Sequence, residues 1–168
     1  MMKHSPRLVV ALIAASLAGC QQTETGSNLP PAQTAVVSAA TLHEMYDDRT
    51  WDWGSGAGFF AKSGDFSAWT EAGGKAAYAT GFWWVTNQGG VCFDGDWRTK
   101  EGANSTVTCF DHRMNGQVWY QRRDPSGPWY IFKSDPPAST DEFAKLKMGD
   151  QVEPKLQALK TSLGASAP

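Results

Sequence analysis

Between residues 50 and 133 most of the large apolar side chains of the chain are aromatic. This stretch holds all eight tryptophans and a single isoleucine, and it has no leucine. Clusters of glycine, asparagine, aspartate or proline divide it into short runs at 50–53, 58–62, 65–70, 76–86, 91–97, 105–112, 117–123 and 129–133. Short aromatic runs bounded by turn residues are typical of β-strands. The pattern therefore predicts an all-β fold, mainly antiparallel with about eight short strands, in a small barrel or a sandwich.

Short helices are expected to flank these strands. Thr41 and Glu44 have the spacing of a capping box, which predicts a helix near residues 39–46. A short helix capped by Thr140 and a weak helix from Lys155 are expected after the last strand.

The N-terminus has the pattern of a bacterial export signal. Lys3 and Arg7 precede an apolar run at 8–17, which is too short to span a bilayer. The run ends in Leu-Ala-Gly-Cys, which resembles a lipoprotein cleavage site, so we expect cleavage before Cys20 and acylation of its thiol. By resemblance to this class of protein, Gln21 implies sorting to the outer membrane.

This signal sets the expected division of the chain. Residues 1–19 form the signal peptide, and the polar, proline-containing stretch 20–37 is a flexible tether. Residues 38–152 form a single β-rich domain, because the length suits one domain. Residues 153–168 are a C-terminal tail.

The charge balance limits the classes of partner. Removing Lys3 and Arg7 with the signal leaves 13 of the 15 basic residues against 17 acidic ones. A net negative chain without a basic patch argues against nucleic acid and against electrostatic docking on anionic lipid. The expected partners are the membrane, through the N-terminal lipid, and an envelope glycan or protein.

With Cys20 acylated, Cys92 and Cys109 remain as an even pair. In an exported protein such a pair predicts a disulfide bond. Two cysteines alone make a poor zinc site, because tetrahedral closure needs four ligands. A hairpin that places the two cysteines opposite each other brings their Cα atoms about 4.5 Å apart, within disulfide range.

This hairpin also predicts a register and two faces. The opposed pairs are Val91 with Phe110, Phe93 with Thr108, and Asp96 with Ser105, and Lys100 and Glu101 lie at the tip. Alternation then gives one apolar core face and one acidic outer face. The runs 82–85 and 129–132 are apolar on both faces, so they are expected to be central strands or strands covered by a helix.

Motifs of catalysis or metal binding are weak in this chain. The glycine run 54–58 is neither a nucleophile elbow nor a dinucleotide loop, and it is better explained by bulky neighbours that crowd the backbone. Asp94, Asp96 and Asp111 could hold calcium, but an acidic solvent face needs no metal. We therefore expect no enzyme activity, no cofactor and no metal.

Eight tryptophans are many for a domain of this size, and most of them are expected to fill the core. One or two are expected to be exposed for binding. The candidate ligand-binding patch consists of Trp83, Trp119, Tyr120, Arg122 and Trp129.

A series of short motifs lies along the chain between residues 42 and 152. They are Thr50-Trp51, Gly56-Ala57-Gly58-Phe59-Phe60, Gly64-Asp65, Gly81 with Trp83, Cys92, Cys109-Phe110, Gly116 with Tyr120, Gly127-Pro128-Trp129-Tyr130, and Gly149-Asp150. In order and spacing they resemble an uncharacterised family of secreted proteobacterial proteins, domain of unknown function 995. The resemblance implies a place in the cell envelope and supplies no catalytic residues.

These observations lead to one functional expectation and two alternatives. The first is a non-catalytic outer-membrane lipoprotein whose periplasmic domain binds an envelope glycan or protein through exposed aromatics. The first alternative is an inhibitor of a cell-wall hydrolase such as lysozyme, with Arg98, Thr99 and Lys100 as the inserted loop. The second is a glycan-active hydrolase, which needs two carboxylates about 5 to 9.5 Å apart across a cleft.

Mass spectrometry of the native protein tests export and acylation together. We expect an N-terminal Cys20 that carries lipid, because the leader has the order of a lipoprotein signal. We also expect Cys92 and Cys109 to resist alkylation, because both sulfurs are in a disulfide. An unmodified N-terminus, or two alkylated thiols, would contradict these expectations.

Overall fold

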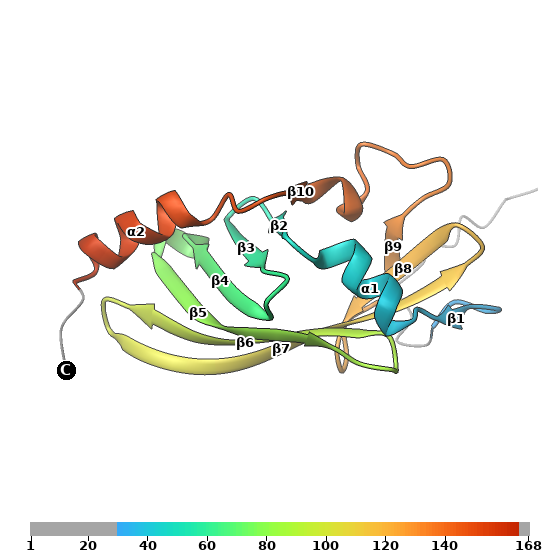
Figure 1. Ribbon diagram of the computed structural model, residues 1–168, viewed down its shortest axis with the longest axis horizontal. Helices are drawn as coiled ribbons and strands as arrows, with labels where there is room; N and C mark the ends of the chain where they lie inside the picture. Colours follow the sequence, from blue (N-terminus) through green and yellow to red (C-terminus); the bar gives the residue numbers. More distant parts are fainter. Residues whose placement is uncertain (1–29, 165–168) are drawn as a thin grey trace, which may run out of the picture.

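A single antiparallel sheet of ten strands forms most of the computed structural model, which describes residues 30–164 (Figure 1). The strands are β1 (Ala35–Val36), β2 (Arg49–Asp52), β3 (Gly56–Phe60), β4 (Asp65–Thr70), β5 (Ala77–Val85), β6 (Gly90–Thr99), β7 (Gly102–Asn115), β8 (Val118–Arg123), β9 (Tyr130–Lys133) and β10 (Leu146–Met148). The helices are α1 (Ala39–Tyr46) and α2 (Glu153–Ser162), with 3₁₀ turns η1 (Ala72–Gly74) and η2 (Glu142–Lys145). The expected signal peptide and acylation at Cys20 lie outside the described residues.

The sheet curls until strands that are distant in its order face each other. Its order is β10-β2-β3-β4-β5-β6-β7-β8-β9, with β1 paired to β7. Four strands separate β2 from β7, yet the rings of Trp51 and Phe110 lie 4.9 Å apart. Figure 1 shows the resulting trough, with the long strands β5 to β7 along one wall and β2 and β3 along the other. The predicted all-β antiparallel class is confirmed, in the form of a partly closed barrel.

The eight strands predicted from aromatic runs are confirmed as β2 to β9. The sequence missed β1 and β10, which are only two and three residues long and depend on distant partners. Ala35 pairs with Met114, and Leu146 pairs with Trp51. The end of the expected tether that the structure describes is therefore part of the domain. Its last residue, Val37, directly after β1, is fully buried.

The central hairpin has the register that the cysteines predicted. Cys92 lies opposite Cys109, with a Cα–Cα distance of 4.1 Å and an S–S bond of 2.08 Å. The flanking pairs are Val91 with Phe110, Phe93 with Thr108, and Asp96 with Ser105, as expected. Lys100 and Glu101 form the tip between β6 and β7. The disulfide therefore ties the beginning of β6 to the middle of β7.

Helix α1 packs against the concave side of the sheet. Ser38 caps it, because the Ser38 hydroxyl accepts the Thr41 amide, so the cap lies three residues before the expected Thr41. At its C-terminal end the fully buried Tyr46 contacts the rings of Trp51, Phe60, His112 and Phe132. These rings come from β2, β3, β7 and β9, so one side chain joins both walls of the trough.

Helix α2 covers part of the convex side, over β4 and β5 (Figure 1). Its residues Leu156 and Leu159 are buried with Val152, Ala57 and Tyr78 in a second apolar cluster. The expected C-terminal tail therefore begins with a packed helix, because its leucines recur at helical spacing and meet an apolar patch on the sheet. No helix among residues 30–164 is long and apolar enough to cross a membrane.

The two runs that are apolar on both faces have different positions in the sheet. The run in β5 lies in a central strand, as expected, although Phe82 is 57% exposed on the convex side. The run in β9 lies in an edge strand with Ile131 51% exposed, so the expectation of a central or covered strand is wrong there. A short edge strand can carry apolar residues outward because its neighbours give little cover.

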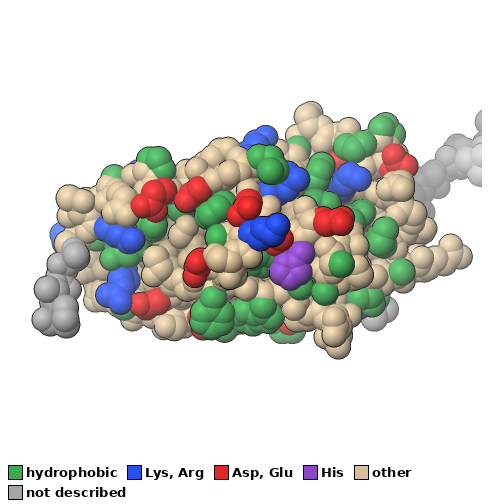
Figure 2. Space-filling view, viewed as in Figure 1, with side chains coloured by type: hydrophobic (Ala, Val, Ile, Leu, Met, Phe, Trp, Pro, Cys, Tyr) green, Lys and Arg blue, Asp and Glu red, His purple; other side chains and the backbone are tan. Residues whose placement is uncertain are grey.

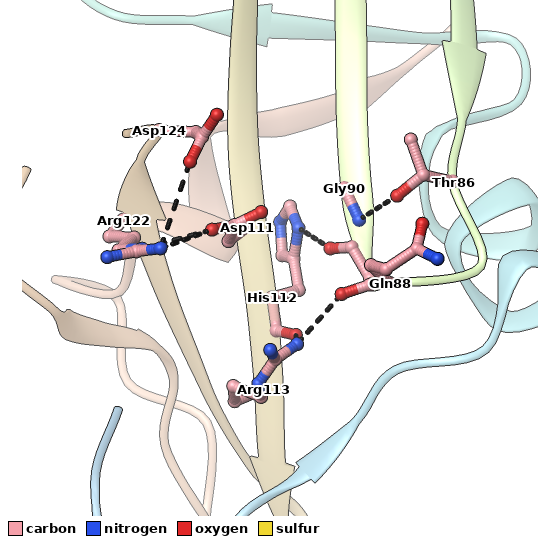
Figure 3. Close-up of polar contacts among 9 residues, drawn as sticks. Thr86, Gln88, Gly90, Asp111, His112, Arg113, Arg122 and Asp124 are labelled. Carbon is pink, nitrogen blue, oxygen red and sulfur yellow. Dashed lines mark hydrogen bonds and ion pairs between the residues drawn. The ribbon is translucent and has the colours of Figure 1, made fainter. Parts of the chain in front are cut away.

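A polar network lies inside the core between α1 and the strands. His112 is fully buried, and its Nδ1 lies 3.2 Å from the Gly89 carbonyl oxygen (Figure 3). The Gln121 amide donates to the Tyr46 hydroxyl at 2.9 Å and to His112 Nε2 at 2.8 Å, and the Tyr130 hydroxyl donates to the Gln121 carbonyl oxygen. Burial lowers the pKa of His112 from 6.5 to about 4, so the ring is neutral and each polar atom has a partner.

We expect the free energy of unfolding to fall as the pH drops from about 6.5 to about 4. In this window His112 becomes protonated in the unfolded chain and stays neutral in the folded chain. The free energy of unfolding therefore falls by about 3 kcal/mol from its value above pH 6.5. Urea unfolding at several pH values measures the loss. His112→Gln should remove this pH dependence, whereas His43→Gln, at a half-exposed site, should retain it. An equal slope in the two variants would contradict the assignment.

Candidate functional site

An aromatic groove opens where β2 curls over β6, β7 and β8. It has a volume of about 300 Å³, at the small end of the range for ligand pockets. Its lining residues are Trp51, Trp53, Phe93, Trp97, Thr108, Phe110 and Arg123. Five of the seven are aromatic, so most of its inner surface consists of flat apolar rings.

Buried rings form the floor of this aromatic groove. Trp51 and Phe93 are 5% and 7% exposed, and Phe110 packs edge-on against Trp51. The Trp51 indole donates its Nε1–H to the Glu142 carboxylate at 2.8 Å, and Glu142 is paired in turn with Lys145. This hydrogen bond and the ring contact hold the floor in one orientation.

The sides of the groove are the partly buried indoles of Trp53 and Trp97, and each indole lies against glycine backbone. A Cβ atom on Gly56 would lie 2.6 Å from Trp53 Nε1, and one on Gly58 would lie 3.2 Å from Trp53 Cζ3. A Cβ on Gly95 would lie 2.9 Å from Trp97 Nε1. These glycines let the indoles lie close to the sheet, and each indole still lines the open groove.

The polar groups at the groove are mainly hydrogen-bond donors. No described residue accepts a hydrogen bond from the indole N–H of Trp53 or Trp97, and Thr108 adds a hydroxyl. Arg123 is the one charged residue in the lining, at the end of β8 and beside Phe110. The groove can therefore stack flat rings and donate hydrogen bonds to acceptors on them.

Two residues of the predicted ligand-binding patch belong to the core instead. Trp83 is 4% exposed and donates its indole N–H to the Ala61 carbonyl at 2.7 Å. Trp119 is 5% exposed and lies beside the ring of Phe132. Both point into the trough, where the rings of opposite walls meet, so the expectation that they are exposed is wrong.

The other three residues of that patch lie on the convex side. The Arg122 guanidinium lies 5.1 Å from the centre of the Trp129 ring. Tyr120 lies two residues before Arg122 on the same strand, β8, and on the same face. Arg122 is paired with Asp111 at 2.8 Å and approaches Asp124 at 3.8 Å (Figure 3). This ion-pair cluster satisfies the arginine within the protein, so the structure separates the predicted patch into a core half and a surface half.

Two further features of the surface are distinct from the groove. Convex residues Phe82 and Val107 are more than half exposed, and Figure 2 shows hydrophobic side chains gathered at the lower edge, where β5 to β7 run in Figure 1. At the hairpin tip Arg98 is paired with Asp96 at 2.8 Å. Among residues 30–164 no three His, Cys, Asp or Glu side chains are placed to hold a metal ion.

A second cavity, of about 420 Å³, lies beside α2. Three carboxylates line it, Asp65, Asp150 and Glu153. The Asp65 carboxylate accepts a hydrogen bond from the Ser63 hydroxyl, and the Asp150 carboxylate accepts hydrogen bonds from the backbone amides of Val152 and Glu153. The Glu153 carboxylate accepts a hydrogen bond from the side-chain amide of Gln157. Each carboxylate therefore already has a hydrogen-bond partner within four residues of it in the sequence.

The sequence reasoning missed Trp53 and Trp97 as site residues. A signal for both was present, because each tryptophan follows an aspartate that alternation turns outward, and each has a glycine two or three residues away. The predicted patch lies instead around the later strands, where Trp83 and Trp119 face the core. Arg123 was missed because alternation alone does not say which face of β8 is concave.

Comparison with known proteins identifies a family and no activity. The sequence profile described as "Protein of unknown function (DUF995)" matches residues 10–152. No curated protein matches the chain. No solved structure matches it either.

We expect Gly58→Ala to lower the free energy of unfolding by about 1–3 kcal/mol, because the added methyl group would crowd the rings of Phe66 and Trp53. Its Cβ would lie 2.9 Å from Phe66 Cε2 and 3.2 Å from Trp53 Cζ3. Ser55→Ala, in the same hairpin and exposed, is the matched control and should leave stability unchanged. Chemical unfolding measures the stability of both variants. Equal unfolding midpoints would show that Gly58 is not tightly packed against these rings.

Proposed function

Since the chain belongs to the DUF995 family, whose description names no activity, we propose its function from the geometry of the groove. The domain is a binding module that holds a glycan of the cell envelope against the indoles of Trp53 and Trp97. It acts without catalysis, from an outer-membrane anchor at Cys20. The aromatic groove replaces the predicted patch as the place of binding.

The observation that carries this proposal is the pair of tryptophans on glycine backbone. Trp53 and Trp97 pack against the edge of the core and against glycine backbone, and both are only partly buried because they also line the open groove. Sugar rings have flat C–H faces that can stack on the two indoles. Their hydroxyl oxygens can accept hydrogen bonds from the indole N–H groups, which have no acceptor among the described residues. Both halves of the recognition are then met by the same two side chains.

The size of the groove favours a glycan over a protein partner. Stable protein–protein interfaces bury about 1,200–2,000 Å² over broad surfaces. The groove is instead a concavity of about 300 Å³ with a mostly aromatic lining. Such a shape suits one end or one short stretch of a sugar chain.

The location in the envelope rests on the N-terminal sequence and the disulfide. The lipoprotein pattern ending at Cys20 supports an acyl anchor, and the Cys92–Cys109 bond is typical of compartments outside the cytosol. The fourteen residues between Cys20 and β1 would separate the domain from the membrane surface and leave the groove free to meet a glycan.

Calorimetric titration with soluble glycan strands of the cell wall tests this function. We expect saturable binding that weakens by about tenfold in Trp53→Ala and in Trp97→Ala, because each loses one stacking surface. Trp84→Ala, also partly buried but on the convex side, is the matched control and should bind as the wild type does. Absence of saturable binding, or an equal loss in the control, would refute the proposal.

A further inference from the structure

Arg123 differs from the neighbouring Arg122 in one respect that bears on the ligand. Arg122 points to the convex side and is held by Asp111 and Asp124. Arg123 lines the aromatic groove, its residue is exposed, and no described side chain forms an ion pair or hydrogen bond with its guanidinium. The groove therefore holds a positive charge that the described part of the domain does not neutralise.

The rest of the groove lining adds no negative charge. None of its seven residues is acidic, and the Glu142 carboxylate, which accepts the Trp51 indole N–H, is already paired with Lys145. A guanidinium presents a planar set of N–H donors that matches a carboxylate in a two-point contact. Charge complementarity therefore favours an anionic group on the ligand, at the Arg123 end of the groove.

The indole N–H groups distinguish a sugar from an acyl chain. A fatty acid would also offer a carboxylate to Arg123, but its chain would cover the Trp53 and Trp97 donors without accepting a hydrogen bond. Burying such donors without a partner costs free energy. A sugar ring can accept these bonds while its flat face stacks, so the whole lining is used.

The single arginine distinguishes a carboxylate from a phosphate monoester. A phosphate monoester carries about 1.5 to 2 negative charges at neutral pH and gains from several cationic partners. Arg123 is the only cation among the lining residues. One guanidinium balances one carboxylate.

We propose that the groove binds an acidic saccharide, in which a sugar ring stacks on Trp53 or Trp97 and a carboxylate pairs with Arg123. This inference rests on the proposed function and names its ligand class. The ring supplies the stacking surface and the hydroxyl acceptors, and the carboxylate sets the orientation of the sugar along the groove.

The test uses the disaccharide of N-acetylglucosamine and N-acetylmuramic acid, which carries one carboxylate, and its methyl ester, which has the same rings and no charge. We expect the wild-type domain to bind the acid at least about tenfold more tightly than the ester, since the ester cannot form the ion pair. Added salt should weaken binding of the acid and leave the ester unchanged.

Two arginine variants sharpen the comparison. Arg123→Gln should bind acid and ester with the same, weaker affinity, whereas Arg98→Gln, an exposed arginine on the convex side of β6, should keep the preference for the acid. Thermal unfolding of each variant checks that the fold is intact. Arg123 is exposed, so neither substitution disturbs the core.

The outcomes separate the two proposals. Equal binding of acid and ester by the wild type would overturn the role of Arg123 and leave a neutral glycan site standing. Failure of both disaccharides and of the glycan strands to bind would overturn the proposed function and this inference together. Displacement of the acid by dodecanoate, or tighter binding of glucosamine 1-phosphate, would overturn the saccharide or the carboxylate part.

Discussion

The buried ring of Tyr46 is the contact on which the shape of this domain depends. It lies between 5.3 and 6.4 Å from rings on β2, β3, β7 and β9, and its hydroxyl bonds with His112 and Gln121. An antiparallel sheet twists by itself, but twist alone does not say how far its walls approach. A large ring wedged between the walls from α1 sets that separation, and the polar network around its hydroxyl permits one orientation of the ring.

The composition of the core follows from this geometry. The walls of the trough are joined by rings that meet edge to face, such as Trp51 against Phe110 and Phe60 against Trp83, and leucine plays no part between residues 50 and 133. Aromatic rings span a wide gap with few residues and gain from edge-to-face contact. Beside Trp51 and Phe110, glycines let Trp53 and Trp97 lie against the sheet at the edge of the core. The groove is thus the open end of the same aromatic core, with Arg123 at its rim.

Local patterns predicted most of the sheet because each strand carried its own signal. Eight of ten strands, helix α1, and the register around Cys92 and Cys109 could be predicted from turn residues, capping residues and the cysteine pair. The strands that escaped prediction, β1 and β10, have too few residues for a periodic pattern and exist only because Met114 and Trp51 lie beside them. The packing of α2 was missed for a related reason, since its leucines gain meaning only from Ala57 and Tyr78 on the sheet.

The sequence by itself determined that the chain folds as an antiparallel sheet of aromatic strands stapled by one disulfide, because alternation, turn residues and paired cysteines act over short distances. Only the tertiary structure decided which tryptophans face a groove. Trp83 and Trp119 resemble Trp53 and Trp97 in chemistry, but the curl of the sheet covers the first two and leaves the second two at its open end. Exposure depends on which segments meet after folding, and residues as distant in sequence as Trp51 and Glu142, which are 91 positions apart, come together only in the tertiary structure.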